Sequence, residues 1–178
     1  MEIENIEKNV SPSDLPKLKL KKMEILGNLK KFSDAIKEGE SFVDKDSLIS
    51  LYSGMFWGMS GNYNLADKYI KDALQKIVLL AELSFALSKA FDYYKSIPEP
   101  PTREVINILF QKNELIKKDF KNDYYRNLYS IATLYERIGE IYRAKSIYEL
   151  IFDSKDLDSE FKEEVGSKIT NLEKVLNP

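Results

Sequence analysis

The chain has 178 residues, of which 43% are hydrophobic and 31% charged, and it contains neither cysteine nor histidine. This apolar content excludes a disordered chain, and the formal net charge of −2 disfavours a general nucleic-acid binder. The missing residue types exclude disulfides, thiol nucleophiles, Cys/His zinc sites and imidazole general bases.

No targeting segment is visible in the sequence. The first ten residues, MEIENIEKNV, have neither the basic nor the apolar region of a signal peptide. No apolar run approaches the roughly 20 residues that span a bilayer. We therefore expect a cytoplasmic protein without a membrane span, and a periplasmic or secreted location only if a leader before Met1 had been removed.

Helices are expected in almost the whole chain, because only 7 Gly and 6 Pro interrupt it. After a polar tail at residues 1–12, Ser13 and Asp14 are typical of a helix start. This first helix is expected to end at Gly27, which can take the left-handed conformation. A second helix follows and reaches residues 42–43.

The third helix is expected at residues 47–60 and contains Gly54 and Gly58. Each internal glycine costs about 1 kcal/mol relative to alanine. A helix that accepts this cost needs space for a close neighbour, so we expect tight packing here. The hinge at Gly61 then leads into a fourth, amphipathic helix.

Whether residues 62–97 form one helix or two stays open, because they contain neither Gly nor Pro. Two helices are the main expectation, with the second at residues 81–96. The proline-rich residues 98–101 end this run, and Thr102 is expected to cap the next helix. The remaining helices are expected at residues 102–116, 125–139, 141–151 and 158–176.

The helices repeat with a regular period, which matches the period of about 34 residues that is typical of helix–turn–helix repeats. One such period separates Gly27 from Gly61 and Trp57 from Phe91, and Tyr135 follows Phe91 after one period and a short insertion. Small and large residues recur around these positions in two well-matched units. They are Gly54, Trp57, Gly61, Ala66, Ile70 and Ala73 in one unit, and Ala132, Tyr135, Gly139, Ala144, Tyr148 and Ile151 in the other.

This pattern resembles the tetratricopeptide repeat (TPR) family. The resemblance implies an all-α protein, a right-handed α-solenoid of about four helix hairpins in a single domain. The hairpins would cover residues 13–46, 47–80, 81–124 with the insertion, and 125–157, followed by a capping helix at 158–178. The first and third hairpins match only in part, and an irregular helical bundle is the alternative.

The resemblance also implies a concave groove, lined by the first helix of each hairpin, that binds a protein or peptide. The corresponding positions are Lys17, Lys21, Leu51, Met55, Met59, Phe85, Lys89, Tyr93, Arg126, Tyr129, Thr133 and Arg137. Methionine and aromatic side chains suit irregular partners. Each of these residues could equally be a core contact. The two lysines would meet an acidic stretch of the partner, or else form a solvated face.

The sequence predicts no enzyme, no cofactor and no metal site. Carboxylates are dispersed over polar helix faces, and no Gly-rich phosphate loop is present. The acidic residues 153–160 lack the glycine and the spacing of an EF-hand loop. We expect them to form a loop in which Asp158 or Ser159 caps the last helix.

The leading hypothesis is a protein-interaction module, an adaptor or assembly scaffold without nucleic-acid partners. The first alternative is a TPR-type secretion or assembly chaperone that shields an apolar client segment. An enzyme with a carboxylate or metal site is the weakest hypothesis. Self-association through an exposed apolar face also fits the sequence.

Overall fold

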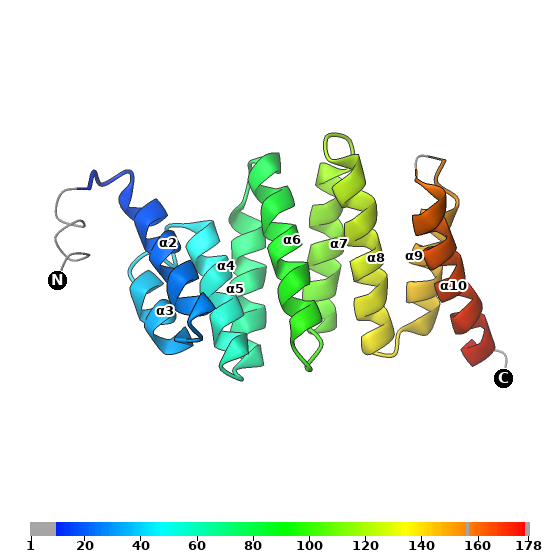
Figure 1. Cartoon of the computed structure of the whole chain (residues 1–178), viewed down its shortest axis with the longest axis horizontal. Coiled ribbons are helices and arrows are strands. Elements are labelled where there is room, and N and C mark those ends of the chain that lie inside the picture. Colours follow the sequence, from blue (N-terminus) through cyan, green and yellow to red (C-terminus); the bar gives the residue numbers. More distant parts are fainter. Residues whose placement is uncertain (1–9, 156, 177–178) are drawn as a thin grey trace. The chain divides into compact units, whose positions relative to one another are not determined.

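The structure is a computed structural model that describes residues 10–155 and 157–176. In these residues the chain forms nine α-helices and no strand, as its composition predicted. It divides into two compact units, one that ends at Val78 and one that begins at Leu79 (Figure 1). Most of the expected polar tail, residues 1–9, lies outside the described residues.

The first unit is a set of helices that pack against their neighbours in the sequence. Its described helices are α2 (Leu15–Asn28), α3 (Phe32–Gly39), α4 (Ser47–Met59) and α5 (Tyr63–Lys76). Helix α2 contacts both α3 and α4, and α4 contacts α5. The buried side chains at the centre of this unit are Met23, Ala35, Ile49, Tyr52 and Phe56.

Gly54 lets α4 approach α5 closely, as its position in the sequence predicted. A Cβ atom at Gly54 would lie 3.0 Å from the carbonyl oxygen of Ala66, from Cγ1 of Ile70 and from Cβ of Tyr69. These contacts are tighter than ordinary van der Waals packing allows. The two helices can therefore pack at this distance only because residue 54 has no side chain.

The first helix does not end at Gly27, so that prediction is wrong. Helix α2 continues to Asn28, and Lys30 takes the left-handed conformation, with φ 58°. Gly27 has a packing role instead, because a Cβ there would overlap the ring of Phe56 and lie 2.6 Å from its Cζ. The missing side chain makes room for the Phe56 ring, and the chain reverses at Lys30.

Gly61 and Gly139 end α4 and α8 with the same turn. Their φ angles are +87° and +80°, in the region that favours glycine. The amide of Asn62 donates to the carbonyl of Trp57 at 2.9 Å, and the amide of Glu140 donates to the carbonyl of Tyr135 at 2.9 Å. This hydrogen bond is typical of a Schellman motif, which satisfies carbonyls at the helix end.

The open question about residues 62–97 is settled in favour of two helices. Helix α5 ends at Lys76 and α6 begins at Leu80. The backbone between them is extended at Ile77 and Leu79, both with ψ 124°. Because no Gly or Pro marks this break, local sequence signals could not locate it.

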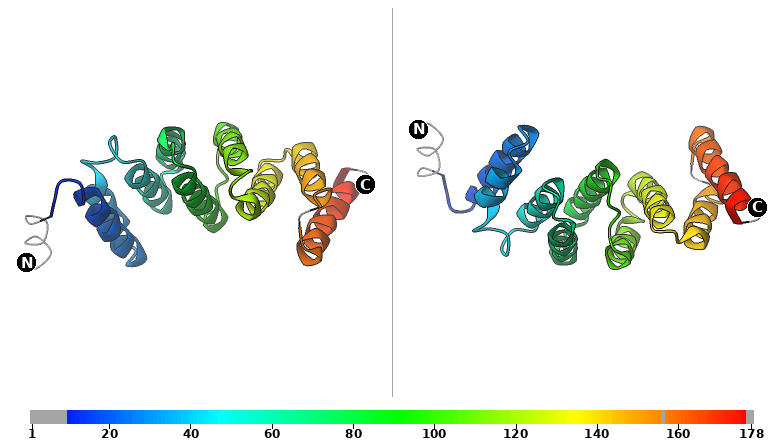
Figure 2. Two further views of the ribbon diagram at one scale, coloured as in Figure 1. Left: turned by 90° about the horizontal axis from the view of Figure 1, so that it is seen from above. Right: turned by 90° about the horizontal axis from the view of Figure 1, so that it is seen from below.

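The second unit contains α6 (Leu80–Ser96), α7 (Arg103–Ile116), α8 (Lys121–Arg137), α9 (Ile141–Phe152) and α10 (Ser159–Leu176). Each helix packs against the next, and α6 also contacts α8. Figure 2 shows that α6, α8 and α10 form one layer of this unit, and α7 and α9 form the other. The expected cap at Asp158 is present, because its Oδ1 accepts a hydrogen bond from the Phe161 amide at 2.8 Å.

Candidate binding groove

Helices α6 and α8 border a hollow of about 480 Å³ in the second unit. Its lining residues, which define the α6–α8 groove, are Ala81, Ser84, Phe85, Ser88, Phe91, Asp92, Lys95, Phe120, Asp123, Arg126, Asn127 and Ser130. Two of the residues predicted from the sequence, Phe85 and Arg126, are among them. Phe85 lies on α6 and Arg126 on α8, so each of the two walls of the groove, α6 and α8, carries one predicted residue.

Phe85 gives the groove an exposed aromatic surface. Its side chain is 44% exposed, although it lies on the inner wall of a hollow. Lys89 lies one helical turn further along α6, and its Nζ is 5.4 Å from the centre of the Phe85 ring. This cation–π contact holds a positive charge beside the apolar surface.

A hydrogen bond joins the two walls of the groove, and buried asparagines hold α8 against α7. The Ser84 hydroxyl on α6 donates to Oδ2 of Asp123 on α8 at 2.7 Å. Beneath α8, Nδ2 of Asn127 donates to Oδ1 of Asn113 at 3.0 Å, and Nδ2 of Asn113 donates to the Tyr124 carbonyl at 3.0 Å. Both asparagines are buried, where an unsatisfied amide would cost about 1–3 kcal/mol. The groove is therefore preformed.

A second, smaller hollow of about 300 Å³ lies between α8 and α10. Arg126 lines both hollows, while Phe161 and Glu164 line only the second. Tyr129 is half-buried beside it, with its ring centre 5.6 Å from that of Phe161 and 5.4 Å from that of Tyr148. Burial, together with a hydrogen bond to Glu164, raises the pKa of the Tyr129 hydroxyl well above its usual value. Tyr129 therefore packs between α8, α9 and α10, and it offers little surface to a ligand.

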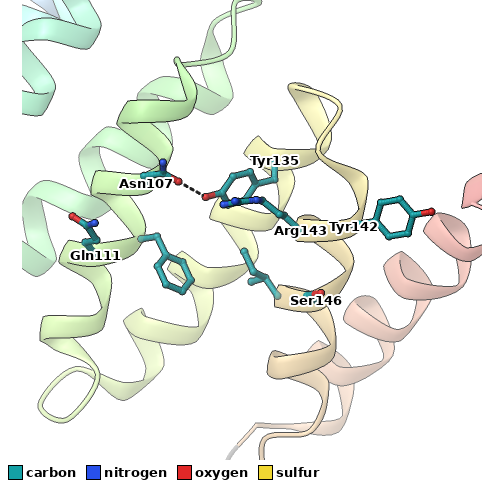
Figure 3. A pocket seen from close by; sticks show the side chains of 8 residues that line it. Asn107, Gln111, Tyr135, Tyr142, Arg143 and Ser146 are labelled. Atoms are coloured by element: carbon teal, nitrogen blue, oxygen red, sulfur yellow. Dashed lines mark hydrogen bonds between the residues drawn. The ribbon is translucent and has the colours of Figure 1, made fainter.

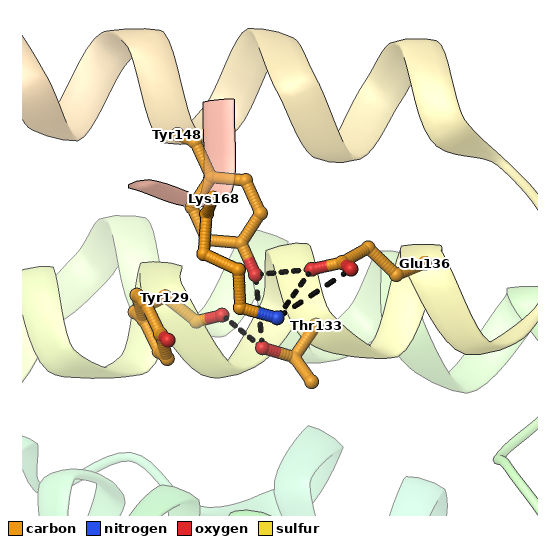
Figure 4. Close-up of polar contacts among 5 residues, drawn as sticks. All are labelled: Tyr129, Thr133, Glu136, Tyr148 and Lys168. Carbon is orange, nitrogen blue, oxygen red and sulfur yellow. Dashed lines mark hydrogen bonds and ion pairs between the residues drawn. The ribbon is translucent and has the colours of Figure 1, made fainter. Parts of the chain in front are cut away.

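Thr133 belongs to a polar cluster that holds α10 against α8 and α9 (Figure 4). Its hydroxyl oxygen lies 3.0 Å from the Tyr148 hydroxyl and 3.0 Å from the Tyr129 carbonyl, and its single proton is donated to one or the other of these oxygens. Tyr148 also donates to Glu136, which forms an ion pair of 3.1 Å with Lys168 of α10. Burial is the main reason that the pKa of Tyr148 is raised. Figure 4 shows the Thr133 hydroxyl inside this network.

Arg137 binds backbone carbonyls of its own unit. Its guanidinium donates to the carbonyls of Ile97 and Pro98 at 2.9 Å each, and also to the carbonyl of Tyr94. Carbonyls at the end of a helix lack intrahelical donors. Arg137 therefore stabilises the end of α6 and the start of the proline-rich loop.

Tyr93, another predicted groove residue, is buried in α6 with only 1% exposed.

In the first unit the predicted residues divide by exposure. Lys17 and Lys21 are exposed on α2, and Lys17 forms a surface ion pair with Asp14 at 3.4 Å. Leu51 and Met55 are buried, so neither offers surface to a ligand in this structure. Met59 is exposed at the end of α4.

Sequence reasoning missed the polar half of the α6–α8 groove. Asp92, Lys95 and Asp123 line it, yet none stood out in the repeat pattern. The contact between Ser84 and Asp123 spans 39 residues of sequence. No local signal could have predicted it, because it depends on how α6 and α8 pack.

Among residues 10–155 and 157–176, the acidic side chains form no group of three or more that could hold a metal ion. Within the same described residues, no helix is both long and apolar enough to cross a membrane. In comparisons with known protein families, with curated protein sequences and with solved structures, nothing matches the chain.

Proposed function

We propose that the chain is a protein-interaction module that binds a segment of a partner protein in the α6–α8 groove. The observation that carries this proposal is the exposed Phe85 ring on the wall of a hollow of about 480 Å³. A few well-packed aromatic side chains commonly supply most of the binding energy at protein interfaces. Phe85 offers such an anchor in a groove that is already formed.

The polar groups of the groove also suit a protein partner. Asp92 and Asp123 balance Lys95 and Arg126, so the lining carries no net charge. A nucleic acid would require a clearly basic surface to replace the counterions of its phosphates. A peptide segment needs only an apolar anchor and scattered hydrogen-bonding groups at the rim.

The finer fold is also a proposal: a right-handed α-solenoid of the TPR kind. Two observations support it. The turns at Gly61 and Gly139 have the same hydrogen-bonding pattern, as repeats of one hairpin would. The first helices of successive hairpins also contact each other within each unit, α2 with α4 and α6 with α8.

Site-specific photocrosslinking in a lysate of the native host tests the binding site. A photoreactive amino acid at Ser88 would lie in the groove, and one at Ser167 of α10 provides a matched control, because both are exposed serines on helices. We expect a defined protein to crosslink at position 88 and not at position 167. Phe85→Ala should weaken that partner's binding by about tenfold or more. Equal crosslinking at both positions, or an unchanged affinity, would refute the proposal.

The partner captured by crosslinking can then be used to distinguish an adaptor from a chaperone. A chaperone would shield an apolar segment of a client that is insoluble alone. Expression of the captured partner with and without this chain measures that directly. A partner that is soluble in both cases supports the adaptor, and a partner that is soluble only in the complex supports the chaperone.

A further inference from the structure

A third hollow lies in the second unit, between α7 and α9 and next to Tyr135 of α8 (Figure 3). Its volume is about 440 Å³, within the range of about 300–1,000 Å³ that is usual for small-molecule sites. Its lining residues lie mostly on α7 and α9, which form one layer of the unit, whereas the α6–α8 groove is lined by helices of the other layer (Figure 2).

The inner surface of this hollow is apolar and rigid. Phe110 of α7 and Ile147 of α9 line it, together with the ring of Tyr135. Tyr135 is buried, and its hydroxyl donates to Oδ1 of Asn107 at 2.8 Å (Figure 3). Because Tyr135 is buried and its polar end is satisfied, its ring supports the hollow from below, and Phe110 and Ile147 supply the apolar surface that a ligand can reach.

The Arg143 side chain places a positive charge at the edge of this apolar surface. The Arg143 guanidinium lies 5.8 Å from the centre of the Tyr135 ring. Its Nε is 2.9 Å from Oε2 of Glu140, and Oε1 of Glu140 is 2.8 Å from Nε of Arg103. These contacts hold Arg143 in place, and the three charged groups together carry a net charge of +1. None of the eight residues that line the hollow is an acid.

We propose that this hollow binds a small planar aromatic anion, such as an aryl carboxylate. The aromatic ring would lie against Phe110 and Ile147, and the carboxylate would meet Arg143. Carboxylates suit arginine because its planar guanidinium can donate more than one hydrogen bond. Gln111 and Ser146 line the hollow and add uncharged hydrogen-bonding groups. A neutral or cationic aromatic molecule would gain only the apolar contacts.

The test compares two probes of the same shape in an NMR titration of the full chain. The probes are 2-naphthoate, which is an anion, and 2-naphthamide, which is neutral. We expect amide shifts in α7 and α9, a dissociation constant for 2-naphthoate on the order of 1 mM, and binding about five- to tenfold weaker for 2-naphthamide. This range allows for the partial exposure of Arg143, whose side chain is 52% exposed.

Two variants and one control locate the site. Arg143→Gln should remove the preference for the anion and leave the neutral probe unaffected. Ser146→Trp should fill the hollow and abolish the binding of both probes. Arg126→Gln, which alters the α6–α8 groove, should change neither affinity. Circular dichroism checks that each variant is folded, and Arg143→Gln decides alone if the tryptophan variant does not fold.

Two results would overturn the proposal. Equal affinity of the wild-type chain for the two probes would show that Arg143 does not select an anion. Shifts confined to helices other than those around the hollow, or unchanged binding by a folded Ser146→Trp variant, would show that the probes bind elsewhere. Neither result bears on the α6–α8 groove, because the two sites are tested by different variants.

Discussion

Alanine at Gly54 is expected to destabilise the first unit, although alanine is the better helix former. The new Cβ would lie 3.0 Å from the Ala66 carbonyl oxygen, from Cγ1 of Ile70 and from Cβ of Tyr69. Two of these atoms belong to the backbone or sit next to it, so they cannot turn aside. Helix α5 would have to move away from α4.

The expected magnitude follows from two opposing contributions. Replacing a mid-helix glycine by alanine gains about 1 kcal/mol of helix propensity. Inserting a methyl group into a packed interface costs about 1–3 kcal/mol. We therefore expect Gly54→Ala to lower the free energy of unfolding by about 1 kcal/mol, and Gly54→Val to lower it by about 3 kcal/mol, since the larger side chain adds to the same clash.

Gly166 of α10 provides a matched control, because it is also a mid-helix glycine. A Cβ there would lie 3.2 Å from Cε2 of Phe152, the end of a side chain that is 45% exposed and can turn away. Gly166→Ala should therefore leave stability unchanged or raise it by up to about 1 kcal/mol. The same substitution is thus expected to have opposite effects at the two positions.

Urea unfolding measures both effects. Trp57 is the chain's only tryptophan and lies in α4, so its fluorescence reports on the first unit, while circular dichroism reports on all helices. A Gly54→Ala protein as stable as the wild type by fluorescence would refute the packing argument. So would the same sign of change at positions 54 and 166.

Three further predictions concern single side chains. Arg137→Met should lower the free energy of unfolding by about 2 kcal/mol, because three carbonyls lose their charged donor; an unchanged urea midpoint would contradict this. Asp46→Ala should cost about 1 kcal/mol, because Oδ1 of Asp46 accepts the Ile49 amide at 2.9 Å, whereas Asp44→Ala, in the exposed loop, should not. The raised pKa of Tyr148 predicts stability that is fully present below about pH 10 and falls at higher pH, because the unfolded chain then loses a proton that the native chain keeps. Tyr148→Phe should reduce this alkaline decline in urea unfolding without removing it, because the pKa values of Tyr52, Tyr124 and Tyr129 are raised as well.

Helix positions were largely predictable because they depend on local information. Apolar periodicity located the helices, and Asp46 and Asn62 cap α4 and α5 through hydrogen bonds within three residues. The sequence suggested a break between α5 and α6 but did not determine its position. It lies at residues 77–79, which contain no Gly or Pro, and the β-branched Ile77 and Val78 lower helix propensity only slightly.

The repeat period pairs Gly27 with Gly61, although the two glycines have different roles. Gly61 forms a turn, with φ +87°, while Gly27 lies inside α2 and makes room for Phe56. Glycine favours both roles, so the residue type alone could not separate them. The true counterpart of Gly61 in the turn after α2 is Lys30, a residue that no glycine-based pattern would select.

Two of the predicted groove residues, Arg126 and Arg137, show that the sequence alone also could not separate a ligand contact from a structural contact. Arg126 and Arg137 both lie on α8, and their spacing of three helical turns gives them nearly the same direction around the helix axis. Arg126 is exposed and lines two hollows, whereas Arg137 donates to carbonyls at the end of α6. What distinguishes them is the partner that α6 presents: a side-chain surface beside Arg126, and the carbonyls around a proline-rich loop beside Arg137. Since proline supplies no amide hydrogen and ends the helix, it leaves carbonyls that need an external donor. An arginine opposite a helix that ends in prolines is therefore better predicted as a structural clamp than as a ligand contact, and Arg126 is the one to test for binding.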